Sequence, residues 1–127
     1  MEKKLILVSH GNFCVELKKS VEMIMGPQDN ILAVPLLEEE GKEEYKEKLL
    51  TVLDTDGDYV ILADLKGGTP GNVAAELLLN GYQAEIYTGM NMPMVIDYIN
   101  SSMLGSEFNP LASGQENIVH LNELLAL

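Results

Sequence analysis

The chain has 127 residues, which suits one domain with its own core. Eight basic residues stand against 20 acidic ones, and the net charge of −12 would repel nucleic-acid phosphates and anionic membrane surfaces. There is no signal segment and no apolar run near the roughly 18 residues of a membrane span, so we expect a soluble, cytoplasmic protein. Cys14 is the single cysteine, and no Cys/His group has metal-ligand spacing, so we expect neither metal nor other cofactor.

Four pairs of a short apolar run and an amphipathic stretch follow one another along the chain. The apolar runs predict strands at 3–8, 31–34, 59–63 and 84–88. In the helices that follow, the residues predicted to face the core are Leu17, Val21, Ile24 and Met25, then Tyr45, Leu49, Val52 and Leu53, then Val73, Leu77 and Leu78, and finally Val95, Ile96, Ile99 and Met103. This succession predicts an α/β fold: an open, doubly wound parallel sheet of order 2-1-3-4 with helices on both faces.

Caps and helix breakers predict where the helices begin and end. The first helix is expected to stop at Gly26-Pro27, and the second to cover 42–53. Thr69 is expected to cap the third helix, with Pro70 as its first residue, and Asn80-Gly81 to end it. Pro93 is expected to begin the fourth helix.

The predicted topology brings His10 and Asp64 together. In a sheet of order 2-1-3-4 the chain reverses direction between strands 1 and 3, and open α/β sheets bind ligands at that crevice. His10 follows the first strand and Asp64 the third. A carboxylate that accepts a hydrogen bond from one imidazole nitrogen fixes the tautomer and leaves the other nitrogen to attack an electrophile. The pair therefore predicts a nucleophilic histidine with an orienting carboxylate.

A glycine-rich turn leads from Asp64 into the third helix. Gly67, Gly68 and Gly71 would let the backbone approach a ligand, and the helix start favours an anion such as a phosphoryl group. Thr69 could cap the helix, donate its hydroxyl to a phosphoryl oxygen, or do both. These parts predict a histidine that accepts and passes on a phosphoryl group without a metal, since no second acid follows the first strand.

Three motifs, each after a predicted strand, resemble those of one bacterial family. They are Ser9-His10-Gly11, Asp64-Leu65-x-Gly67-Gly68-Thr69-Pro70-x-Asn72 and Gly89-x-Asn91-x-Pro93-Met94. Together they resemble the mannose-family IIA component of the sugar phosphotransferase system, over nearly the whole chain. The resemblance implies a phosphotransferase in which His10 is phosphorylated, Asp64 is its hydrogen-bond partner and Thr69 contacts the phosphoryl group. It also implies HPr as donor, a IIB component as acceptor, and membrane IIC and IID components beyond.

The resemblance extends to partner docking and assembly. Candidate docking residues are Gly11, Asn12, Lys66, Asn91, Met92, Pro93 and Met94, with Lys66 at a position where we would expect an apolar residue more often. The family is dimeric and exchanges a C-terminal strand, so a short edge strand at 118–121 could play that part in a homodimer, with a short helix or frayed end after it. Because no linker and IIB domain follow, we expect a free-standing IIA protein of one domain, 1–127, whose sugar is unspecified.

Other classes of protein explain the same residues less well. A phosphoacceptor aspartate module would need further acids after the first strand to hold Mg²⁺. A flavin module needs a longer loop there, and a serine hydrolase using Ser9 would need a nucleophile elbow. The methionines at 90, 92 and 94 fit adaptable packing or docking better than a soft-metal site. One alternative stays open: a regulatory module of the same fold that signals its phosphorylation state to a partner protein.

Overall fold

The computed structural model describes residues 4–127. One parallel sheet has the order β2-β1-β3-β4 and is built from β1 (Lys4–His10), β2 (Ile31–Leu36), β3 (Asp58–Ala63) and β4 (Gln83–Tyr87). All three strand pairs run parallel. Strand order and direction confirm the predicted doubly wound sheet. Lys3, the first residue of the first predicted strand, lies outside the described residues.

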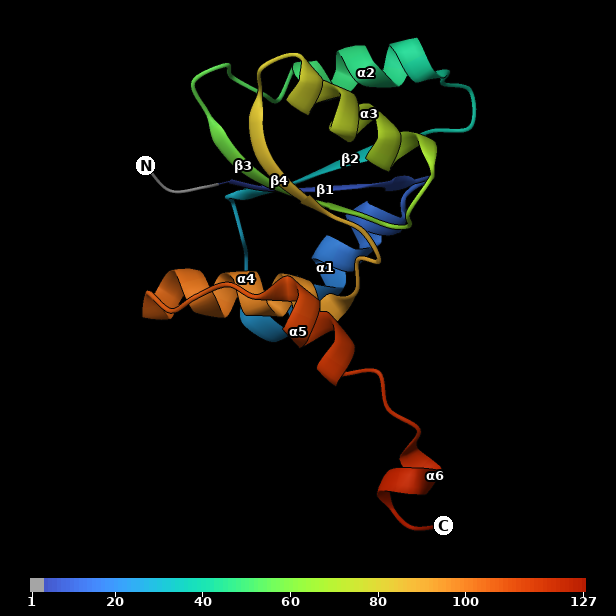
Figure 1. Cartoon of the computed structure of the whole chain (residues 1–127), viewed down its shortest axis with the longest axis vertical. Coiled ribbons are helices and arrows are strands. Elements are labelled where there is room, and N and C mark those ends of the chain that lie inside the picture. Colours follow the sequence, from blue (N-terminus) through green and yellow to red (C-terminus); the bar gives the residue numbers. More distant parts are fainter. Residues whose placement is uncertain (1–3) are drawn as a thin grey trace.

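Helices cover both faces of the sheet (Figure 1). On one face lie α2 (Lys42–Leu50) and α3 (Thr69–Leu79). On the other lie α1 (Phe13–Met25) and α4 (Met92–Leu104), with α5 (Pro110–Glu116) packed against α4. The last helix, α6 (Leu121–Leu124), stands away from the sheet. No helix within residues 4–127 is both long enough and apolar enough to span a bilayer.

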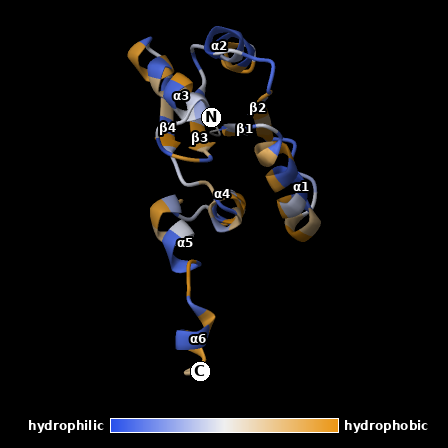
Figure 2. Cartoon of the chain, turned by 90° about the vertical axis from the view of Figure 1, so that its right-hand side faces the viewer, coloured by the Kyte–Doolittle hydropathy of each residue, from blue (hydrophilic) through white to orange (hydrophobic). Residues whose placement is uncertain are grey.

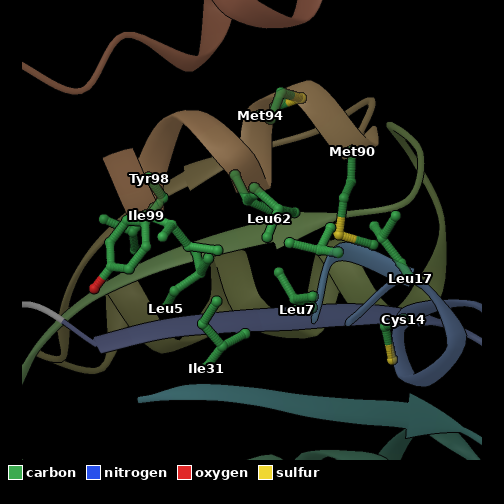
Figure 3. Close-up of a cluster of buried hydrophobic side chains, with 13 residues drawn as sticks. Leu5, Leu7, Cys14, Leu17, Ile31, Leu62, Met90, Met94, Tyr98 and Ile99 are labelled. Atoms are coloured by element: carbon green, nitrogen blue, oxygen red, sulfur yellow. The ribbon is translucent and has the colours of Figure 1, made fainter. Parts of the chain in front are cut away.

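The sheet separates two hydrophobic clusters. Because side chains alternate along a strand, Leu5 and Leu7 face the α1 and α4 layer, whereas Ile6 and Val8 face α2 and α3. Figure 3 shows Leu5 and Leu7 pointing from β1 toward residues of β3 and α4. Since both faces are covered, the central strands are continuous apolar runs, as is usual in parallel sheets. This arrangement leaves the carboxyl ends of β1 and β3 as the place where polar side chains emerge.

Several predicted boundaries shift in the structure. The second strand continues through Pro35, which an edge strand tolerates because one side of its backbone needs no ladder partner. The second helix ends at Leu50, and a turn follows it. Thr69 is not a cap: Gly68 occupies the N-cap of α3 in extended backbone conformation, so Thr69 is the first helical residue and Pro70 the second.

Three residues that were predicted to face the core are exposed instead. They are Ile24, Leu78 and Met103, with exposed fractions of 63%, 42% and 71%. Each is the second-to-last residue of its helix, where contact with the sheet is ending, although Met25 at the very end of α1 still packs against the core. Helical periodicity cannot reveal this, because it continues to the last residue whether or not a sheet still lies beneath it.

The C-terminal segment differs most from the sequence prediction. No helix is predicted from the sequence at 105–114, yet α5 (Pro110–Glu116) begins within this stretch. The short strand predicted at 118–121 is wrong for this single chain, because residues 118–120 are irregular and Leu121 begins α6. Figure 2 shows the segment extending away from the body with hydrophobic residues along it. Exchange of this segment in a dimer stays a prediction.

Candidate functional site

His10 and Asp64 meet at the carboxyl edge of the sheet. His10 is the last residue of β1, and Asp64 directly follows the neighbouring β3. The Asp64 N–H donates to the carbonyl of Val8 at 3.2 Å, which prolongs the ladder by one residue. The His10 Nδ1 atom lies 2.7 Å from Oδ2 of Asp64. The side chain of His10 is 48% exposed and that of Asp64 only 12%, so the ring is accessible while its carboxylate is shielded.

Hydrogen bonds hold the Asp64 carboxylate in its charged form. Its Oδ2 also accepts from the main-chain N–H of His10 at 2.9 Å, and its Oδ1 accepts from the N–H of Leu65 at 2.9 Å. Burial acts to raise the pKa of Asp64, but the bonds from His10 and Leu65 outweigh it and lower the pKa. Because an ionised carboxylate only accepts hydrogen bonds, Nδ1 of His10 carries the proton and Nε2 keeps its lone pair.

The glycine turn lies against the other edge of the ring. A Cβ atom on Gly68 would come within 2.5 Å of the His10 Cε1 atom and 3.2 Å of Nε2, so only a glycine fits there while the ring keeps this position. Gly67 has a φ of 84°, in the left-handed region, and its carbonyl accepts from the Asn72 side chain at 3.4 Å. The start of α3, with its unpaired N–H groups, is therefore next to Nε2, where it would attract an anion.

The other predicted residues of the phosphoryl-binding loop differ in position. Thr69 is half-buried in the first turn of α3, directly after the N-cap residue Gly68. Gly71 is buried inside α3, where an added Cβ would lie 3.4 Å from that of Ala63. Gly71 therefore brings the helix close to β3, a packing role that the motif spacing could not distinguish from ligand binding.

The predicted docking residues divide into exposed and structural ones. Asn12 and Lys66 are exposed, and Gly11, Met92 and Pro93 are half-buried. Asn91 caps α4 by accepting from the N–H of Met94 at 3.2 Å, and its amide donates to the carbonyl of Gly114 at 3.2 Å. Met94 is 3% exposed and packs in the core, so it fits the packing interpretation of the methionines and not the docking one.

Sequence reasoning missed two exposed apolar residues that lie close in the chain to His10 and Asp64. Phe13 and Leu65 are 50% and 49% exposed. Phe13 begins α1, three residues after His10, and Leu65 follows Asp64 directly. An apolar residue in each loop next to a candidate nucleophile was a signal in the sequence that could have marked them. No group of three or more His, Cys, Asp or Glu in residues 4–127 is arranged to hold a metal ion.

Comparison with known proteins assigns the family. A family model described as the PTS system fructose IIA component matches residues 4–112. The fructose-specific EIIA component of Bacillus subtilis (strain 168) is 32% identical over 98 residues, which are 75% of this chain and 67% of that protein. The mannose/sorbose-specific IIA subunit of Enterococcus faecalis has a TM-score of 0.80 and 31% identity over 94% of this chain and 95% of that one. The EIIA component of Streptococcus agalactiae has a TM-score of 0.86 and 25% identity, covering 96% and 99% of the two chains. Fold, sequence and solved relatives agree, and the chain belongs to the mannose-family IIA components of the bacterial sugar phosphotransferase system.

Proposed function

We propose that the chain is a single IIA domain, over residues 1–127, that carries a phosphoryl group on His10. It takes the group from the phosphohistidine of HPr and gives it to a histidine of a IIB component, which phosphorylates a sugar entering through membrane IIC and IID components. The observation that carries the proposal is the 2.7 Å contact between Nδ1 of His10 and Asp64, because it leaves Nε2 as the nucleophile. The donor and acceptor imply a cytoplasmic location.

The phosphoryl transfer needs no cofactor, because one phosphorus–nitrogen bond breaks as another forms. The lone pair of Nε2 attacks phosphorus, the phosphorus–nitrogen bond of the donor breaks, and its electron pair returns to the donor histidine. The His10 ring keeps its proton on Nδ1 and becomes positively charged, which the ionised Asp64 stabilises through their hydrogen bond. Transfer to IIB is the same step in reverse, with the acceptor nitrogen as nucleophile.

The glycine turn supplies the anion-binding part of the proposed site. Main-chain N–H groups at Gly67, Gly68 and Thr69 would face the phosphoryl oxygens, together with the positive end of the α3 dipole. Thr69 is the first residue of α3 rather than its N-cap, and its hydroxyl would donate to one of these oxygens. Stabilisation then rests on fixed dipoles and positioning, which are the main terms in phosphoryl transfer.

Both partner proteins would dock around the exposed ring. Phe13 and Leu65 offer apolar surface beside His10, and Asn12 and Lys66 offer polar groups in the same loops. Gly11, Met92 and Pro93 complete the set that we propose for docking. The net charge of −12 favours partners with basic faces, because opposite charges steer association.

We also propose a homodimer formed through the C-terminal segment. Its apolar side chains are largely exposed: Ile118, Val119, Leu121, Leu124, Leu125 and Leu127. β4 lies at one edge of the sheet, and edge strands readily accept another strand. A cavity of about 420 Å³ between β4 and the end of α4 is lined by Glu85, Tyr98 and Phe108, among others, and could receive part of the partner's segment.

Phosphorylation from phosphoenolpyruvate through enzyme I and HPr tests the function. The chain has two histidines, and the second, His120, is 66% exposed in the C-terminal segment, so it is a matched control. We expect an acid-labile, base-stable phosphate on the wild type and on His120→Ala, and none on His10→Ala, as read by mass spectrometry. Label on Asp64, or undiminished label on His10→Ala, would contradict the proposal.

A further inference from the structure

Ser9 is a buried polar residue directly before His10. It is 0% exposed, and within residues 4–127 only Ser101 is also a buried polar side chain. Alternation along β1 puts Ser9 on the same face as Leu5 and Leu7, where an apolar residue would pack against α1. A buried hydroxyl costs free energy unless it is hydrogen-bonded, so its partners indicate what it contributes.

The Ser9 hydroxyl makes two hydrogen bonds to the turn that leaves His10. It donates to the carbonyl of Gly11 at 2.9 Å and accepts from the N–H of Cys14 at 2.8 Å. Cys14 lies in the first turn of α1, whose N–H groups have no partner within the helix. The cap residue Asn12 makes no capping bond with its side chain, so Ser9 supplies the missing acceptor from the preceding strand.

With Ser9 included, three consecutive peptide groups around His10 are held. The N–H of His10 donates to Asp64 at 2.9 Å, and the N–H of Gly11 donates to the carbonyl of Leu36 at 2.7 Å. The carbonyl of Gly11 accepts from Ser9. Gly11 has a φ of 56°, so the chain turns sharply here and depends on such bonds to keep its direction. The backbone that carries the imidazole is thus fixed on both sides.

We propose that Ser9 is a positioning residue for His10, which rests on the phosphoryl-carrier function proposed above. Its hydroxyl joins β1 to the start of α1 and holds the Gly11 turn, so that the ring stays against Asp64 on one edge and Gly68 on the other. Without the hydroxyl, the buried Cys14 N–H and the half-buried Gly11 carbonyl would each lose this hydrogen-bond partner. The turn would then rearrange, and the alignment of Nε2 with an incoming phosphorus would be lost.

Three substitutions of Ser9 and one control test this role. Ser9→Ala removes the hydroxyl, Ser9→Cys keeps a similar volume with a weak hydrogen-bonding group, and Ser9→Thr keeps the hydroxyl. The control is Ser101→Ala, because the Ser101 hydroxyl is also buried but bonds to Asp97 and the Glu107 carbonyl at the far end of α4. The readouts are the rate of phosphorylation by phospho-HPr, the tautomer of the His10 ring by nitrogen NMR, and thermal unfolding.

We expect Ser9→Ala to slow phosphorylation about tenfold and to mix the two ring tautomers, because a small displacement of a reacting atom is costly. Ser9→Cys should fall between Ser9→Ala and Ser9→Thr, and Ser9→Thr should keep the wild-type tautomer and rate. Ser101→Ala should lower the unfolding temperature without changing the phosphorylation rate or the tautomer of the His10 ring. If Ser9→Ala does not fold, Ser9→Cys is compared with Ser9→Thr. A lower phosphorylation rate and mixed tautomers in Ser9→Cys alone would then support the positioning role, and equal values would overturn it.

Two results separate the positioning role from the proposed function. Equal rates and unchanged ring spectra in all three Ser9 variants would overturn the positioning role, even if His10 is phosphorylated. If the wild type takes no label from phospho-HPr, the carrier function fails, and the ring spectra still decide whether Ser9 orients the imidazole.

Discussion

The candidate site and the C-terminal segment differ in how their backbone is held. Around His10, hydrogen bonds connect residues far apart in the chain. Asp64, directly after β3, accepts from the N–H of His10, and Leu36, at the end of β2, accepts from the N–H of Gly11. In residues 118–127 the hydrogen bonds join neighbours, such as the N–H of Leu125 to the carbonyl of Leu121 at 2.9 Å. Apolar side chains are buried beneath the site and exposed along the segment.

This difference indicates two ways of reaching a functional geometry. The proposed site lies within one chain, so a partner protein would meet the ring, the carboxylate and the glycine turn already in place, which would lower the entropic cost of the proposed reaction. The C-terminal segment has too few contacts of its own to hold one arrangement, and we expect it to take its final conformation against another surface. Substitutions in the two regions should therefore affect different measurements.

The largest effect is expected at the turn that touches the ring. Gly68→Ala would place a Cβ 2.5 Å from Cε1 of His10, so the ring must turn away from α3. We expect phosphorylation by phospho-HPr to fall about 100-fold, because displacement of the nucleophile by about 1 Å has effects of that size. The measurement is the initial rate of phosphate incorporation.

Gly41→Ala is the matched control for Gly68→Ala. Gly41 also caps a helix, α2, with nearly the same backbone angles, but the nearest atom to an added Cβ is a Glu44 side-chain oxygen at 3.5 Å. We expect it to fold and react like the wild type. A Gly68→Ala variant as active as Gly41→Ala would show that the ring is free to move without cost.

The fold and the central pair could be predicted from the sequence for definite reasons. Apolar runs such as 59–63 fix strands, and strand order places the loops after β1 and β3 together, so His10 and Asp64 could be paired before any coordinates. Gly67 and Gly68, which precede Thr69, predicted the turn that lies next to His10 and Asp64. These inferences depend on topology, which is set by few rules.

The features that the sequence did not predict depend on how side chains pack in the fold and on contacts with a second chain. Nothing in the spacing of Met92 and Met94 says that the first is half-exposed and the second buried beside Gly114. Ser9 looked like part of a motif, whereas its two hydrogen bonds appear only when the strand and the helix start are both in place. The strand predicted at 118–121 was inferred from its apolar residues and from the family resemblance, and in the single chain residues 118–120 do not pair with another strand.

A second, intermediate effect is expected in the C-terminal segment. Leu121 and Leu125 are 60% and 62% exposed and lie one helical turn apart, so they share a face. Replacing both with Gln should shift the proposed dimer to monomers in light scattering, while phosphorylation of His10 stays near the wild-type rate. Met23→Gln, which changes an apolar residue of α1 that is 88% exposed, should leave the dimer unchanged. A wild type that is monomeric at every concentration would contradict the dimer.

The smallest effect is expected in the acid stability that Asp64 contributes. Because hydrogen bonds lower the pKa of Asp64 in the folded chain, the unfolded chain takes up the proton at a higher pH. The stabilisation of the folded chain by Asp64 is therefore fully present above the ordinary carboxyl pKa of about 4. It is lost as the pH falls through the lower pKa that Asp64 has in the folded chain. Asp64→Asn should unfold more easily at pH 7 by about 1.5 to 3 kcal/mol, the scale of a hydrogen bond to a charged group, and the gap should narrow below about pH 4.

Urea unfolding of the wild type and Asp64→Asn at several pH values measures that gap. Glu76→Gln is the control for surface charge, since Lys42 lowers the pKa of Glu76 through an exposed ion pair that also weakens in acid. Salt should diminish the Glu76 effect far more than the Asp64 effect, because the carboxylate of Asp64 is shielded beneath the ring and bonded to main-chain N–H groups. A gap for Asp64→Asn that stays constant from pH 7 to pH 3 would mean that the carboxylate is not held in its charged form by His10 and Leu65. An ionised carboxylate would then no longer be the reason that the proton of His10 stays on Nδ1 and leaves Nε2 free to react.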